Sequence, residues 1–222
     1  SKYKESAVWA NPNDLTMRFT AKRYAKFENV AINHSNVCVA NSNATKEDFL
    51  NRYSAPINWN CKVIHWGVDT DMFHPLKRDD EDDYIIYSEV RSRFNVKANS
   101  HLLLAVGRLA ARKGFGMLLQ SFAMVKQKSP NAILVIVGRG KLRSRLLKQA
   151  KKLGLEGSVF IESSMNFDNL ALLYRVSDLV IYPSYYEGQG LIPLEAMASG
   201  TPVVTVDHGP LAEMVDNTVG AL

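Results

Sequence analysis

From Ser100 to its end, the chain alternates short apolar runs with amphipathic segments. The length and continuous hydrophobicity of these runs are typical of strands buried on both faces. Each run and the helical pattern after it form a βα unit, and such units build a parallel sheet with right-handed crossovers. We therefore predict a Rossmann-like, doubly wound α/β sheet with strands at 101–106, 132–137, 159–161, 179–182 and 203–206.

Helical spacing of apolar residues predicts the connecting helices and their ends. They are expected at 115–128, about 142–153, after a cap at Asn166 or Asp168, at about 190–199 and at 211–215.

The first third of the chain has a separate pattern of elements. We predict a helix at 13–33 that starts at Asn13 or Asp14, strands at 36–41 and 62–65, and a helix at 44–53. Two strands and two helices hardly build an independent core, so residues 1–76 are expected to be the C-terminal part of a larger N-terminal domain. The charged tract 77–83 resembles a surface linker. We therefore assign 77–99 to a linker and 100–222 to a second domain, truncated at its end.

The segment 186–204 carries the strongest functional signal. Glu187 and Glu195 flank the turn Gly188-Gln189-Gly190, and a helix is expected to start there, at about Gly190. A helix start offers unpaired N–H groups and a positive dipole end to an anion such as phosphate. Carboxylates accept hydrogen bonds from hydroxyls, so the pattern predicts a site for a phosphorylated, hydroxyl-rich ligand. The alternative is that the two glutamates are unrelated surface residues.

Two turns that follow buried strands carry further candidate residues. Gly107, Arg108 and Lys113 follow the first strand of the sheet, at the carboxyl end where doubly wound sheets bind ligands. Arg112 is an alternative to Lys113 as the nearer cation. Gly138 follows the second strand, where its small size would let a nucleoside approach the backbone. A dehydrogenase is disfavoured because the first turn lacks G-x-G-x-x-G. No Walker sequence occurs either, so a P-loop phosphate site is not indicated.

Three runs in order resemble glycosyltransferase family 4: Val106–Gly114, Leu134–Gly140 and Asp178–Val204. The segment Lys62–Pro75 is similar to the crossover between the two domains of that family. The resemblance covers residues 36–222. It departs from the family at Trp66, where Asn is more frequent, and at Gln189, where an aromatic residue is frequent.

The resemblance implies a GT-B fold with two Rossmann-like domains and a retaining transfer of a hexose from a UDP- or GDP-sugar to an acceptor hydroxyl. It implies that Arg108 and Lys113 bind the diphosphate, that Glu187 contacts the sugar, and that Glu195 contacts the ribose. The N–H groups of Gln189, Gly190 and Leu191 would lie near the sugar and diphosphate. No cofactor and no metal would be required. A non-catalytic nucleotide-sugar-binding module is the alternative function.

The remaining expectations concern partners, cellular location, the cysteines and Glu213. The net charge of +5 favours anionic partners. The basic cluster between 139 and 152 has no interleaved aromatic residues, which argues against nucleic acid; an exposed helix face is favoured over a peripheral membrane contact. A glycan, lipid-linked or small-molecule acceptor and a cytoplasmic location are expected. Cys38 and Cys61 are expected to be free thiols. Glu213 aligns with a frequent family acid, with a surface role equally favoured.

Overall fold

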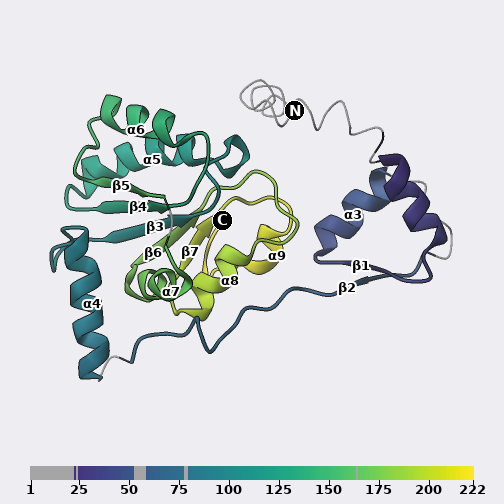
Figure 1. Cartoon of the computed structure of the whole chain (residues 1–222), viewed down its shortest axis with the longest axis horizontal. Helices are drawn as coiled ribbons and strands as arrows, with labels where there is room; N and C mark the ends of the chain where they lie inside the picture. The colour runs from purple at the N-terminus through teal and green to yellow at the C-terminus, as the bar shows by residue number, and fades with distance from the viewer. Residues whose placement is uncertain (1–22, 24, 53–58, 78–79, 164) are drawn as a thin grey trace.

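The computed structural model describes residues 23, 25–52, 59–77, 80–163 and 165–222. Its main body is a six-stranded sheet in the order β5-β4-β3-β6-β7-β8, and every pair is parallel (Figure 1). Counted from β3, this is the strand order 3-2-1-4-5-6 of the Rossmann fold. The strands are β3 (Leu102–Val106), β4 (Ile133–Val137), β5 (Val159–Glu162), β6 (Leu179–Tyr182), β7 (Val203–Thr205) and β8 (Gly220–Ala221).

The predicted doubly wound α/β fold is confirmed. The five expected strands match β3 to β7, with bounds that differ by at most one residue. The sheet also has the two-residue strand β8, which was not predicted because Gly220-Ala221 has no apolar run to signal it.

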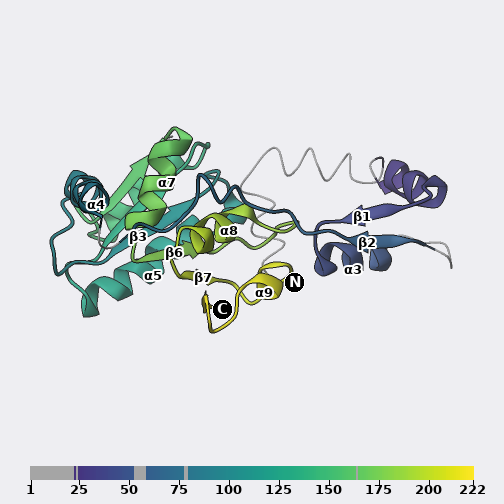
Figure 2. The ribbon, with the colours of Figure 1, turned by 90° about the horizontal axis from the view of Figure 1, so that it is seen from below.

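Helices cover both faces of the sheet, as the views in Figures 1 and 2 show. Alternate residues of β3 face opposite layers: Leu102 and Leu104 pack in one core, and Leu103 and Ala105 pack in the other. The first core includes residues of α7 (Phe167–Val176) and α8 (Leu191–Ala198), and the second includes residues of α5 (Phe115–Lys128) and α6 (Arg143–Lys152). The remaining short elements are η1 (Ala111–Lys113) and α9 (Leu211–Met214).

One helix of the main body was missed in the sequence. We interpreted 77–83 as a surface linker, but α4 (Glu81–Arg93) begins inside this tract. The carboxylate of Asp80 accepts from the N–H groups of Asp82 and Asp83 and caps the helix. The acidic residues of the first turn also interact favourably with the positive end of the helix dipole. The charge run therefore starts a helix.

The first third of the described chain forms a small unit beside the main body (Figure 2). Strands β1 (Cys38–Ala40) and β2 (Cys61–Val63) pair in parallel, with Cys38 opposite Cys61, and both thiols are free. Helix α3 (Asn43–Arg52) contacts both strands. Residues 25–34 are helical, as predicted, whereas the expected helix start at Asn13 or Asp14 lies outside the described residues.

The segment 64–77 leads from β2 to the main body and is held along its length. The ring of Phe73 packs edge-on against the ring of Tyr174, with centroids 5.8 Å apart. The guanidinium of Arg175 donates to the carbonyl oxygen of Met72 at 2.6 Å. Side chains and the backbone of this segment are therefore fixed against α7.

Candidate functional site

The candidate residues gather where the strand order reverses. The chain leaves β3 toward β4 on one side and leaves β6 toward β7 on the other. The crevice outside the carboxyl ends of two such strands is the usual ligand site of a doubly wound sheet. The turn after β3 contains Gly107, Arg108 and Lys113, and the turn after β6 contains residues 183–190. The fold thus brings the two predicted turns together.

Lys113 is the centre of the contacts between these turns. It is 8% exposed, and its ammonium donates to the hydroxyl of Tyr182 at 2.6 Å and to the carboxylate of Glu187. Within the described part of the chain, these bonds use two of the three donors that an ammonium has. Burial lowers the pKa of Lys113, and the neighbouring charges of Arg112 and Arg108 lower it further, against the opposing effect of Glu187.

Glu187 is fixed by several donors at one carboxylate oxygen. Its Oε1 atom accepts from the hydroxyls of Ser184 at 2.5 Å and Tyr182 at 2.8 Å, and lies 3.5 Å from the Arg112 guanidinium. Burial alone would raise the pKa of Glu187, but the bonds from Lys113, Ser184 and Tyr182 outweigh it and lower the pKa. The carboxylate is therefore held in its charged form, in one orientation.

The cations expected in this region differ in exposure. Arg108 is exposed, and its positive charge contributes to the lowered pKa of Lys113. Arg112 donates to the carbonyl oxygen of Tyr186 at 2.8 Å and so also ties the turn after β3 to the turn after β6. Lys113 and Arg112 both approach Glu187, and Arg108 is the more accessible cation.

The second predicted glutamate has a separate partner. Glu195 on α8 accepts a hydrogen bond of 2.7 Å from the hydroxyl of Tyr174, which is fully buried in α7. Burial raises the pKa of Glu195, and the bond from Tyr174 opposes the rise. Burial, then Glu187, and to a smaller degree Glu195, raise the pKa of Tyr182. Both glutamates therefore raise the pKa of the same tyrosine.

The two glycines at the start of α8 pack closely against other side chains of the chain. Gly190 has φ 98°, a value that side chains rarely tolerate, and an added Cβ would lie 3.1 Å from Leu211 and 3.5 Å from the ring of Tyr182. Gly188 faces the side chain of Asn41. Leu191 is exposed, whereas Gln189 is buried and its amide bonds the backbone of Trp66. Only the main chain of Gln189 is left to meet a ligand.

The glycine after β4 has a structural reason that the sequence did not indicate. A Cβ on Gly138 would lie 1.9 Å from the carbonyl oxygen of Gly107. The turns after β3 and β4 thus meet backbone to backbone. We expected Gly138 to admit a nucleoside, and the contact with Gly107 requires a glycine there independently of any ligand.

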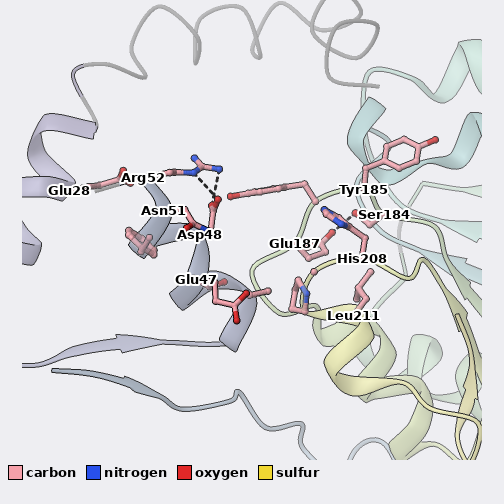
Figure 3. A pocket seen from close by; sticks show the side chains of 16 residues that line it. Glu28, Glu47, Asp48, Asn51, Arg52, Ser184, Tyr185, Glu187, His208 and Leu211 are labelled. Atoms are coloured by element: carbon pink, nitrogen blue, oxygen red, sulfur yellow. Dashed lines mark hydrogen bonds and ion pairs between the residues drawn. The ribbon is translucent and has the colours of Figure 1, made fainter. Parts of the chain in front are cut away.

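A cavity of about 420 Å³ lies between the turn after β6, residues 208–211 and α3. Ser184, Tyr185 and Glu187 line one side, and Glu47 and Asp48 of α3 face them, as Figure 3 shows. The cavity adjoins the Lys113 contacts through Glu187, so a ligand held at the carboxyl ends of the strands would border on α3.

Several residues of the site were not predicted. Tyr182 ends β6 and Ser184 follows in the turn that leads to Glu187, and the Tyr-Pro-Ser sequence at the end of a buried strand was their only signal. Tyr174 was assigned only to an apolar helix face. Glu213, for which a surface role was equally favoured, accepts from the backbone of α3, which only a three-dimensional contact could reveal.

Two further observations bear on the kinds of site present. Across the described ranges, no three His, Cys, Asp or Glu side chains gather as a metal site would require. Among the helices that the structure describes, none combines the length and the apolar character needed to cross a membrane.

Known proteins resemble the chain both in sequence and in fold. The family described as glycosyl transferases group 1 matches residues 87–222. An uncharacterized glycosyltransferase of Methanocaldococcus jannaschii is 32% identical over 82% of this chain and 45% of its own length. The mannosylfructose-phosphate synthase of Agrobacterium fabrum is 35% identical over 68% of this chain and 34% of its own length. The chain therefore spans less than half the length of these curated relatives.

A solved structure shares the arrangement of the elements. HepE of Anabaena, solved in complex with UDP and glucose, has a TM-score of 0.74 and 26% identity, over 87% of this chain and 50% of HepE. Because 87% of the chain is more than residues 80–222, the similarity also includes residues before position 80.

Proposed function

The chain belongs to the glycosyltransferase group 1 family and has the Rossmann-like fold of GT-B enzymes, and from this premise we propose that it is part of a glycosyltransferase. The donor would be a UDP- or GDP-linked hexose, and the acceptor a hydroxyl of a glycan, a lipid-linked sugar or a small molecule. The complex of HepE with UDP and glucose supports a nucleotide-sugar donor. Residues 100–222 would bind this donor, and residues 1–76 would belong to the acceptor side.

The observation that carries the proposal is the buried ion pair of Lys113 and Glu187 beside the exposed Arg108. These groups sit at the carboxyl ends of β3 and β6, where the diphosphate of the donor would bind. As the bond to the anomeric carbon breaks, negative charge grows on the leaving diphosphate. Fixed cations at that point stabilise the transition state more than the ground state.

Each remaining residue has a role in this proposal. The N–H groups of Gln189, Gly190 and Leu191 would face the diphosphate and sugar, and Gly107 and Gly138 would border the nucleoside. Glu187 would orient sugar hydroxyls, and Glu195 would accept from the ribose. The acceptor hydroxyl would attack from the face that the diphosphate leaves, so the anomeric configuration would be retained. With the cations in this role, a divalent metal is not required. A cytoplasmic location, with the basic face of α6 turned to water, is the setting we propose.

Calorimetry with UDP, GDP and their hexose derivatives tests the donor site. Lys113→Ala and Glu195→Ala are expected to weaken binding at least tenfold, whereas Lys148→Ala on the exposed face of α6 should leave it unchanged. Unchanged affinity in both site variants would refute the assigned contacts. Transfer by the full-length protein, as opposed to binding alone, separates the enzyme from a non-catalytic module.

A further inference from the structure

Two side chains of the small unit form hydrogen bonds with the turn that contains Glu187, at the carbonyl oxygen of Gly188. The hydroxyls of Ser42 and Thr45 lie 2.7 Å and 2.9 Å from this oxygen, and both can donate to it. Ser42 is buried at 1% exposure, and its hydroxyl also accepts from the N–H of Thr45 at 3.0 Å. The start of α3 is thus shaped to present two donors to one carbonyl of the opposite unit.

Helix α9 makes a second set of hydrogen bonds with the same end of α3. The carboxylate of Glu213 accepts from the N–H groups of Asn43 at 2.9 Å and Ala44 at 2.6 Å, and from the side-chain amide of Asn43 at 3.1 Å. These N–H groups belong to the first turn, where they have no partner within the helix. A carboxylate at a helix start also interacts favourably with the dipole.

Gln189 makes the third connection. Its side-chain oxygen accepts from the N–H of Trp66 at 2.7 Å, and its nitrogen donates to the carbonyl oxygen of the same residue at 3.1 Å. Gln189 is 2% exposed, so both bonds are shielded from water. An apolar or aromatic side chain at position 189 could make neither of them.

We propose that Ser42, Thr45, Gln189 and Glu213 are positioning residues, and we call them the clamp. They hold the turn 187–190 in its shape from across the boundary between the small unit and the main body. By this inference, which rests on the proposed function, the clamp orients Glu187 and the main chain of Gly188 toward the sugar of the donor. Of the contacts to the nucleotide, those made at Glu195 and Arg108 lie outside the turn that the clamp holds.

This division gives the clamp a distinctive signature in binding. The double variant Ser42→Ala, Thr45→Val is expected to lower affinity for the nucleotide sugar about fivefold, the effect of one or two neutral hydrogen bonds. Affinity for the free nucleoside diphosphate should fall less, because it has no sugar for Glu187 and Gly188 to contact. The variants Ser42→Thr and Thr45→Ser keep the hydroxyls and should restore the wild-type ratio. Gln149→Ala removes a half-buried amide bond to Gly116 away from the site and serves as the control.

Amide hydrogen exchange of the free protein tests the clamp without a ligand. Glu213→Ala should speed exchange at Asn43 and Ala44 at least tenfold, because a charged acceptor is lost. Gln189→Ala should do the same at Trp66, and the Ser42/Thr45 double variant should speed exchange at residues 188–190.

The outcomes separate the clamp from the donor assignment. Unchanged exchange at 188–190 in the double variant would overturn the clamp, and so would an equal loss of affinity for both ligands, which indicates general unfolding. If the unmodified chain binds no UDP or GDP derivative, the proposed function fails, and exchange in the free protein alone then decides whether the clamp holds the turn.

Discussion

The ammonium of Lys113 donates to the carboxylate of Glu187, 74 positions further along the chain. This pair joins the turn after β3 to the turn after β6 at the reversal of strand order. Since both side chains are largely buried, the pair stays intact only while each partner is present. Removing one partner of a buried pair is strongly destabilising, because the other charge is left uncompensated.

Replacing Lys113 with Met should therefore affect binding and stability together. Nucleotide-sugar affinity is expected to fall at least tenfold, and the melting temperature should also fall, although Arg112 at 3.5 Å from Glu187 compensates part of the lost charge. Lys148→Met, on the exposed face of α6, is the matched control. Calorimetry and thermal unfolding measure the two effects. Wild-type affinity in Lys113→Met would remove this lysine from the donor site.

The lowered pKa of Glu187 predicts how stability depends on pH. Its folded-state pKa lies below the ordinary value of 4.5, so its contribution is present above that value and is lost as pH falls through the folded pKa. Glu187→Gln should therefore lower the free energy of unfolding at neutral pH, and the difference from wild type should shrink below about pH 4.5. Urea unfolding at several pH values measures it, with the exposed Glu156→Gln as the control. A difference that grew on acidification would contradict the assignment.

Glu195 predicts the opposite pH behaviour for binding. Burial raises its pKa above the ordinary 4.5. If its carboxylate accepts from ribose hydroxyls, donor affinity should decline as pH falls through this raised pKa, at a higher pH than for an ordinary glutamate. Tyr174→Phe removes the bond that opposes the rise, so the decline should begin at a still higher pH. Calorimetry across this range tests both statements, and Glu195→Gln should flatten the profile. A wild-type profile without this decline would show that the Glu195 carboxylate is not required.

The contact of Gly138 with the Gly107 carbonyl predicts a severe cost for one added methyl group. Gly138→Ala places a Cβ where only 1.9 Å is available to a backbone oxygen, so the turns after β3 and β4 must separate. We expect a loss of about 1–3 kcal/mol in unfolding free energy, the range typical of overpacking within a core. Gly67→Ala meets no atom within 4 Å and should be close to neutral. Equal stability of the two variants would contradict the tight approach.

The residues of the main body carried most of the information about the fold. The strands β3 and β4 are buried on both faces, and their apolar runs ended at the glycines where the structure ends them. The alternation of such runs with helical patterns predicted the parallel sheet. Helix α4 was missed because its apolar residues do not line one face of the helix, and because its capping residue Asp80 stands within a run of charged residues. Strand β8 was missed because its pairing with β7 is set by the sheet, and its own residues are Gly and Ala.

The same distinction applies to the site, where residues with a local sequence signal were predicted and their partners from distant elements were not. Arg108, Lys113 and Glu187 were predicted from turns at strand ends, and the structure brings these turns together. The partners that fix them, such as Tyr182 for Lys113 and Tyr174 for Glu195, depend on side chains from different elements meeting in space. The spacing of residues along the sequence does not indicate such contacts. For the same reason the bond of Glu213 to α3 could not be separated from a surface role.

The backbone contact between Gly107 and Gly138 also limits how this crevice can respond to an incoming molecule. With no side chain between them to yield, the turns after β3 and β4 must shift as one body or remain still. On the side that faces α3, the clamp ties the turn 187–190 to the start of that helix, so an adjustment to the size of a ligand would have to move the turn and the small unit together. Relatives that bind ligands of different size would therefore be expected to differ in the turn 187–190 and the start of α3, more than in the turns after β3 and β4.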